Sequence, residues 1–297
     1  MKKNTKQIKN HMIFNKILMT ILIIYTIALL SVILWGMYTS VKSFDEYRNN
    51  IAFPPRQNIL NWEWENFTVI LNNFTVRPRG SVRSIGVLEQ LWNTILFAGV
   101  GSLITTVVTC VMAYVVAIYD NKFSKLIYSV VLVTMILPIV GSYPSEIALL
   151  RNLGLYDTFI GIWIQRANFL GIYFLVFYAQ FKTLPKDYAE AAYMDGASEF
   201  KIMTKIMMPL VANTFGTILL IKFIEGWNDY QTVLLYLPTK PTLIYGLFEL
   251  SNNTVGELNT VPMRMAGVMM LIIPVIAVFI AFRNRLLDNI TAGGIKE

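Results

Sequence analysis

The chain has 297 residues and a formal net charge of +7, and 55% of its residues are hydrophobic whereas only 14% are charged. Soluble globular proteins carry about 25% charged residues, so this composition excludes a soluble cytoplasmic enzyme, a disordered chain and a secreted disulfide scaffold. The basic residues flank apolar runs instead of gathering on one polar domain, which argues against nucleic-acid binding. One histidine and one cysteine leave no basis for a metal site built on those ligands.

Six apolar stretches are candidates for membrane-spanning helices, each of which needs roughly 20 residues. In chain order they cover residues 17–38, 91–119, 126–140, 169–181, 208–227 and 265–282. The fourth stretch is short, and residues 160–164 are expected to extend it. The sequence therefore predicts an all-α membrane protein with six transmembrane helices.

The topology follows from the lysines and arginines near the ends of these spans. Residues 1–16 carry five lysines and no acidic residue, and the first apolar run is too long for the core of a cleaved signal peptide. We therefore expect a cytoplasmic N-terminal segment (1–16), a six-helix membrane domain (17–282) and a cytoplasmic tail (283–297). This topology leaves a long outer segment over residues 42–90.

Between the fourth and fifth predicted spans lies the least apolar helical stretch of the chain. Asp187 would stand in the first turn of a helix, Gly196 would break it, and Ser198 would cap a second helix up to residue 207. Pro209 would then open the next span. The pattern predicts a helix-turn-helix on the cytoplasmic side, which on its own could equally be a solvated connector.

The residues of this segment resemble the EAA loop of ABC importer permeases. The resemblance rests on Glu190-Ala191-Ala192, on Asp195-Gly196-Ala197 and on Pro209, although Met208 stands where the family usually has leucine. Trp227-Asn228-Asp229 and the tail Thr291-Ala292-Gly293-Gly294-Ile295-Lys296 are similar to elements of the carbohydrate-uptake branch of that family, in its smaller-permease type. The likeness covers nearly the whole chain and is weakest over residues 42–90.

The resemblance implies a permease subunit of a binding-protein-dependent ABC importer in the bacterial cytoplasmic membrane, forming half of the path for a carbohydrate such as an oligosaccharide. It implies a distinct second permease, two ATPase subunits and an extracytoplasmic solute-binding protein as partners, besides membrane lipid. ATP and Mg²⁺ would be held by the ATPase subunits; this chain would bind no cofactor and perform no catalysis. The residues expected to couple it to the ATPase are Glu190, Ala191, Ala192, Asp195, Gly196, Ala197 and Pro209.

Several polar residues lie in or just after the fifth predicted span, where ionisable side chains are costly and usually face a protein interior or an aqueous cavity. Lys222, Glu225 and Asp229 share one broad helical face, with Asn228 beside them. They are candidates for the translocation path or gate, with Trp227 or Tyr230 offering a ring to a sugar. The alternative is a network of pairs that only holds helices together.

The third predicted outer segment ends in a polar tip that contains Asn252, Asn253, Glu257 and Asn259. The resemblance implies that this tip contacts the solute-binding protein, and the alternative is a solvated turn. Other functions compatible with the composition are an ion-coupled secondary transporter, a membrane-embedded enzyme such as a lipid transferase, and an importer permease for a solute that is not a sugar. No internal repeat and no cluster of carboxylates or histidines supports the first two.

Overall fold

The computed structural model describes residues 2–78, 82–119, 121–137, 141–185, 187–252, 258 and 260–292, with only the course of the backbone for 2–12 and 282–292. The described part is helical apart from one isolated antiparallel bridge between Val76 and Ile85. It divides into unit 1, residues 1–74 and 250–272, and unit 2, residues 75–249 and 273–297. The elements are α1 (Lys2–Thr39), α2 (Phe44–Asn49), η1 (Ile59–Asn61), α3 (Glu65–Asn73), α4 (Val87–Thr94), η2 (Ile95–Val100), α5 (Gly101–Ile118), α6 (Lys122–Ile136), α7 (Tyr143–Asn152), α8 (Phe159–Arg166), α9 (Ile172–Thr183), α10 (Asp187–Met194), α11 (Glu199–Ile202), η3 (Met203–Met207), α12 (Met208–Leu210), α13 (Ala212–Trp227), α14 (Tyr230–Tyr236), α15 (Leu243–Asn252) and α16 (Val261–Ala292).

In unit 1, the apolar part of α1 is exposed along residues 13–34. Its last turns differ: Gly36 is buried, and a Cβ placed there would lie 2.9 Å from the Met269 methyl group of α16. The absence of a side chain at Gly36 thus lets the end of α1 approach the first half of α16 closely. Flexible methionines suit such a helix contact.

The first part of the long segment 42–90 is held to the end of α1 by buried polar contacts. Lys42 is fully buried, and its Nζ donates hydrogen bonds to the carbonyls of Asn50 and Phe53, at 2.5 and 2.6 Å. Asn66 of α3 donates to the carbonyls of Ser40 and Lys42, both at 2.9 Å. Because the buried Lys42 and Asn66 donors find carbonyl partners, the first part of this segment is fixed to the end of α1.

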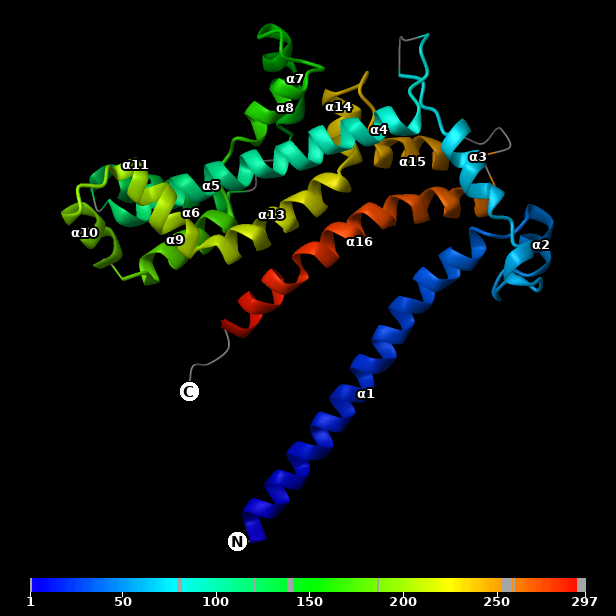
Figure 1. Cartoon of the computed structure of the whole chain (residues 1–297), viewed down its shortest axis with the longest axis horizontal. Coiled ribbons are helices and arrows are strands. Elements are labelled where there is room, and N and C mark those ends of the chain that lie inside the picture. The colour runs from blue at the N-terminus through cyan, green and yellow to red at the C-terminus, as the bar shows by residue number, and fades with distance from the viewer. Residues whose placement is uncertain are drawn as a thin grey trace. The chain divides into compact units, whose positions relative to one another are not determined.

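Unit 2 is built around one long helical rod, Val87–Ile118, which comprises α4, a π-helical middle section η2, and α5. In it α5 packs along α9 and α13 and also contacts α6 (Figure 1). Small residues on α5, among them Cys110, Ala113 and Ala117, are at most 3% exposed. Small side chains let helix axes approach closely, which is a main source of packing energy in a membrane.

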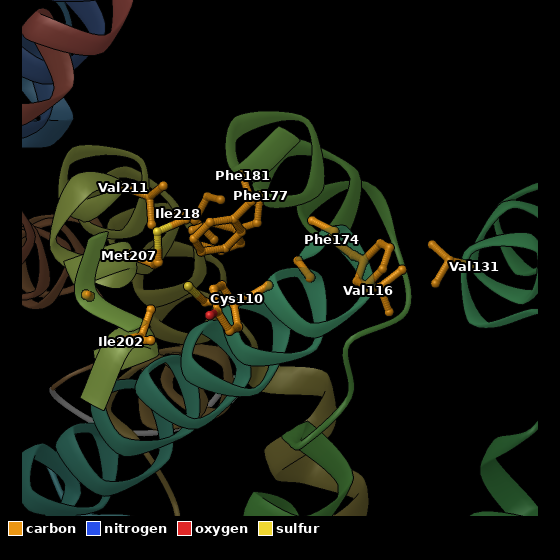
Figure 2. Close-up of a cluster of buried hydrophobic side chains, with 14 residues drawn as sticks. Cys110, Val116, Val131, Phe174, Phe177, Phe181, Ile202, Met207, Val211 and Ile218 are labelled. Atoms are coloured by element: carbon orange, nitrogen blue, oxygen red, sulfur yellow. The ribbon is translucent and has the colours of Figure 1, made fainter. Parts of the chain in front are cut away.

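A cluster of buried apolar side chains lies where α5, α9 and the start of α13 meet the segment after Gly196 (Figure 2). Phe177 and Phe181 of α9 point towards Met207 and Ile218 in this view, and Cys110 of α5 lies beside them. All of these side chains are no more than 3% exposed. The segment between α10 and α13 is therefore packed into the helix bundle.

Among the described residues, three helices are long and apolar enough to cross a membrane: Ile13–Thr39, Val87–Ile118 and Val261–Ala281. A fourth crossing results if Glu199–Leu210 and Ala212–Trp227, which meet at a bend of 77°, count as one broken span. At 1.5 Å per residue, α6 and α9 reach only about 22 and 18 Å, short of the roughly 30 Å of hydrocarbon. The all-helical membrane fold agrees with the sequence prediction.

One detail of the predicted spans was wrong. Residues 160–164 do not extend the fourth span, because they belong to α8, which ends at Arg166, and Gly171 with φ 130° separates it from α9. The fifth predicted span, residues 208–227, contains a bend, since Val211 (φ −105°, ψ 14°) leaves the α-helical region between α12 and α13.

The close turn before α8 gives a stability prediction. A Cβ added to Gly161 would lie 2.3 Å from the Leu155 carbonyl oxygen and 3.2 Å from Thr158 Oγ1, so backbone must move. We expect Gly161→Ala to destabilise the fold by about 1–3 kcal/mol and to lower the melting temperature of the purified transporter. Gly99→Ala is the matched control, because its nearest new contact is an ordinary 3.9 Å; equal melting temperatures for the two variants would contradict the prediction.

Candidate functional site

The helix-turn-helix predicted around Gly196 is present. Residues 187–210 are called the coupling loop from here on, after the role that the sequence resemblance leads us to expect. α10 ends in a turn in which the Gly196 N–H donates to the Tyr193 carbonyl (2.9 Å) and the Ala197 N–H to the Ala192 carbonyl (3.0 Å). These two bonds define a Schellman motif, whose turn residue has a left-handed backbone. Gly196 has φ +76°, so glycine is required there by backbone geometry.

The second half of the coupling loop begins at Ser198, whose extended backbone starts α11, although its side chain makes no capping bond. The helix continues as the π-helical η3 and the short α12, which holds Pro209, and then bends by 77° into α13. Tyr119, just past the end of α5, donates a hydrogen bond to Glu199 at the start of α11. That bond, together with partial burial, raises the pKa of Tyr119 to about 12.

The coupling loop has one face in the bundle and one face exposed. Ala192 is 7% exposed and belongs to the core cluster, whereas Glu190, Ala191, Asp195 and Gly196 are exposed. Four large side chains of the two helices are also exposed, at 48–88%: Tyr188, Tyr193, Met194 and Phe200. Exposed apolar side chains mark an interaction site where they form one contiguous patch. Sequence reasoning missed these four residues, although their place next to the recognised motif could have drawn attention to them.

The second candidate site is a group of charged side chains within unit 2, called the polar cluster. Lys222 and Glu225 of α13 form an ion pair at 2.8 Å, and the Tyr173 hydroxyl donates to the other oxygen of Glu225 at 3.0 Å. The Lys222 ammonium lies 4.5 Å from the centre of the Tyr173 ring. These contacts join α13 to α9.

Arg166, the last residue of α8, completes the polar cluster. It forms an ion pair with Asp229 at 3.2 Å, and the other oxygen of Asp229 caps α14 by accepting the Thr232 N–H at 3.0 Å. The Arg166 and Asp229 side chains are only 19% and 28% exposed. The pair therefore joins α8 to the start of α14, where each charge neutralises the other.

Two glycines make room for Arg166. A Cβ at Gly101 would lie 2.8 Å from its Cδ, and a Cβ at Gly226 would lie 2.9 Å from its Nη1. The guanidinium also lies 4.2 Å from the centre of the Phe97 ring, a cation–π contact. Phe97 belongs to the π-helical η2, and such sections are frequent at functional sites.

Two cavities border the polar cluster. One of about 340 Å³ is lined by Ser102, Thr105, Arg166, Lys222, Glu225, Gly226 and Asp229. The other, of about 190 Å³, shares Thr105, Arg166 and Lys222 and adds residues such as Asn168 and Tyr173. Hydroxyls and paired charges thus face open space between α5, α8, α9 and α13, a setting that offers hydrogen bonds to a polar solute.

The other residues predicted near the fifth span lie outside these contacts. Trp227 is 3% exposed and packs on Phe223 at 5.5 Å between ring centres, and Tyr230 stacks on Phe248 at 4.4 Å. The Asn228 side chain donates to the Ile224 carbonyl of its own helix at 2.9 Å. Both aromatic rings are therefore already occupied by packing.

Sequence reasoning did not include Arg166 and Tyr173 in the cluster. Both come from segments far from α13 in sequence, so helical spacing could not connect them to it. One signal was present: an acidic residue such as Asp229 inside a membrane protein needs a basic partner.

The tip predicted to contact a binding protein is described only in part. Asn252 is exposed at the end of α15, whereas Asn253, Glu257 and Asn259 lie outside the described residues.

The arrangement of helices is similar to that of a solved structure. It superposes with a TM-score of 0.76 on a chain from the crystal structure of a bacterial ABC transporter involved in the import of the acidic polysaccharide alginate, over 92% of this chain and 96% of that chain. The two sequences are 22% identical, so this likeness concerns the fold.

Two sequence relatives are permease proteins of transport or uptake systems. The arabinooligosaccharides transport system permease protein AraQ of Bacillus subtilis is 28% identical over 236 residues, which is 78% of this chain and 79% of that protein. The osmoprotective compounds uptake permease protein GgtD of Synechocystis is 28% identical over 252 residues, 82% of this chain and 83% of that protein.

A family model decides the assignment. The model for the binding-protein-dependent transport system inner membrane component matches residues 106–290, more than half of the chain and a range that includes both the coupling loop and the polar cluster. The chain belongs to this family and is thus a multi-pass permease component of the inner membrane, not an enzyme.

Proposed function

We propose that this permease forms one half of the translocation path of an ATP-driven importer for a carbohydrate, of oligosaccharide size. The cargo class is supported by the arabinooligosaccharides named for AraQ and the alginate named for the similar structure. A cavity lined by hydroxyls and paired charges suits a solute that is rich in hydroxyl groups. A second candidate cargo is an osmoprotective compound, as named for GgtD.

The coupling loop is the proposed contact with the ATPase subunits, which would hold ATP and Mg²⁺. The observation that carries this proposal is the turn at Gly196, with buried Ala192 on one side and exposed Tyr193 and Met194 on the other. Nucleotide-driven closure of the ATPases would push on the exposed side. Because the buried side is packed against α9 and α13, the push would move the helices that carry the polar cluster.

The proposed topology has six crossings by α1, the rod Val87–Ile118, α6, α9, α13 and α16, with both termini and the coupling loop in the cytoplasm. The short α6 and α9 would cross a bilayer thinned by their neighbours or rely on flanking turns. The membrane domain would then be residues 17–282, between the cytoplasmic segments 1–16 and 283–297. A distinct second permease would supply the other half of the path, and a solute-binding protein would dock near Asn252 on the outside.

The polar cluster is proposed to line this path as a network of pairs. Lys222–Glu225 and Arg166–Asp229 leave neither sign of charge in excess, so an uncharged solute would not compete with a bound counter-ion. The Arg166–Asp229 pair also joins α8 to the start of α14, and the Tyr173–Glu225 hydrogen bond joins α9 to α13, which would brace the path between transport cycles.

The coupling proposal is tested by a series at Gly196. A Cβ there meets no atom within 4 Å, so any penalty comes from the φ of +76° alone. We expect Gly196→Asn to keep transport coupled, because asparagine tolerates this backbone, and Gly196→Pro to abolish it, because proline fixes φ near −65°. The measurement is ATPase activity of the reconstituted importer with and without loaded binding protein; full stimulation of the Gly196→Pro importer would refute the proposal.

Glu190 gives an independent test, since its side chain is exposed and its replacement should not disturb folding. We expect Glu190→Lys to reduce the stimulation of ATPase activity by loaded binding protein while insertion into the membrane stays normal. Glu65→Lys, at the start of α3 in the outer segment, is the matched charge reversal. Equal stimulation in both variants would argue against the assigned contact.

The polar cluster is tested by a double-mutant cycle on Arg166→Gln and Asp229→Asn. Because the pair is mostly buried, removing either partner leaves the other charge uncompensated. The double variant should therefore lose less stability than the two single variants lose together. We expect a coupling energy of about 0.5–3 kcal/mol from the melting temperatures of the assembled importer. The exposed pair Arg83–Glu89 is the control and should be nearly additive. Additive effects at Arg166 and Asp229 would show that the pair braces nothing.

A further inference from the structure

The turn over residues 50–54, called the return turn from here on, runs back along α1 in unit 1. Trp35 Nε1 donates a hydrogen bond to the Ile51 carbonyl at 3.0 Å, and the Tyr38 hydroxyl donates to the Ala52 carbonyl. Side chains on a helix lean towards its N-terminus. Both carbonyls therefore lie beside the last turns of α1 and not beyond its end.

The position of Trp35 along α1 matches the outer boundary of a bilayer. Ile13–Thr39 is one of the helices long and apolar enough to cross a membrane. From Lys16, the last charged residue before the apolar run, the helix rises about 29 Å to Trp35, close to the roughly 30 Å of hydrocarbon. Tryptophan and tyrosine are enriched at membrane–water interfaces. Under the topology proposed above, Trp35, Tyr38 and the return turn therefore lie at the outer interface.

The return turn presents apolar side chains to its surroundings. Ile51 is 54% exposed and Phe53 is 72% exposed, and Ala52 and Pro54 between and beside them are exposed too. Full burial of a side chain such as isoleucine or phenylalanine is worth about 1.5–3 kcal/mol. Contact with acyl chains would provide that burial at this level.

The backbone of the return turn is prepared for an apolar medium. All five of its carbonyls accept hydrogen bonds from side chains. The donors to carbonyls 50–54 are, in that order, Lys42, Trp35, Tyr38, Lys42 and Asn50. A carbonyl without a partner costs several kcal/mol in hydrocarbon, where water cannot replace the bond. With these partners in place, the turn can enter the edge of the bilayer without that cost.

We propose that the return turn inserts Ile51 and Phe53 into the outer leaflet, at the level of the head groups and the first acyl carbons, and so anchors the outer segment to the membrane. The exposed surface of α1 over residues 13–34 ends directly before Trp35, to which the turn is bonded. The turn thus extends a surface that faces lipid, and lipid is its partner. The proposal rests on the topology proposed above and not on the cargo or the coupling.

The test places an environment-sensitive fluorescent label on the return turn, in the importer reconstituted into nanodiscs with partner subunits that lack accessible cysteines. Cys110, the one cysteine of this chain, is buried, so Ala52→Cys supplies its reactive thiol. Glu63→Cys is the matched control, because Glu63 is exposed and its N–H donates to the Val41 carbonyl, beyond the end of α1. We expect the label at residue 52 to emit at shorter wavelength and to be quenched by lipids with a nitroxide near the head group. The label at residue 63 should show neither effect.

A second change ties the quenching to the apolar side chains. In the Ala52→Cys background, Phe53→Asp should abolish quenching by the nitroxide lipids, because a charge opposes insertion, whereas Phe53→Leu should retain it. Phe53 is largely exposed, so neither replacement should disturb folding. Equal quenching at residues 52 and 63, or quenching that Phe53→Asp leaves unchanged, overturns the proposal. A label at residue 52 with shifted emission that nitroxide lipids do not quench is covered by protein, such as the second permease, and this also overturns it.

The topology is read separately, by labelling Glu63→Cys in intact cells with a maleimide that does not cross the membrane. Labelling from outside is the expected result. Quenching at residue 52 without such labelling would overturn the topology and the assignment to the outer leaflet, whereas labelling without quenching would overturn the insertion alone. Neither measurement depends on ATPase activity, through which the Gly196 series reports on coupling.

Discussion

The packing of the coupling loop into the bundle is the contact on which the other features depend. Phe177 and Phe181 of α9 belong to the same buried cluster as Met207 and Ile202, which follow the turn at Gly196, and all four are at most 1% exposed. Close-packed protein interiors have low compressibility and transmit strain. Under the proposed coupling, a force applied at the exposed face would therefore displace α9 and α13 as bodies.

Two of the charges of the polar cluster, Lys222 and Glu225, lie on α13, and Tyr173 lies on α9. Under the proposed coupling, a movement of the coupling loop would reach the proposed path through these helices of 16 and 12 residues. A relative displacement of the two helices would alter the Tyr173–Glu225 hydrogen bond and the contact of Lys222 with the Tyr173 ring, because both cross between them.

The helices and the turn at Gly196 could be predicted, because they depend on residues that are close together in the sequence. The turn at Gly196 follows from a single glycine after a short helix, and the apolar runs give the helices. Arg166 and Tyr173 could not be assigned to the cluster, because their contacts arise from tertiary packing across segments more than 50 residues apart. The extension of the fourth span over residues 160–164 failed for a related reason: α8 and α9 are separate helices, with Gly171 at φ 130° before α9, which hydropathy does not record.

The bare surface of α1 has a consequence for assembly. Residues 13–34 are exposed and mostly apolar. In a bilayer, a surface of this kind faces lipid or the helix of a neighbour. The placement of this helix would then depend on its surroundings in the membrane as much as on its own sequence.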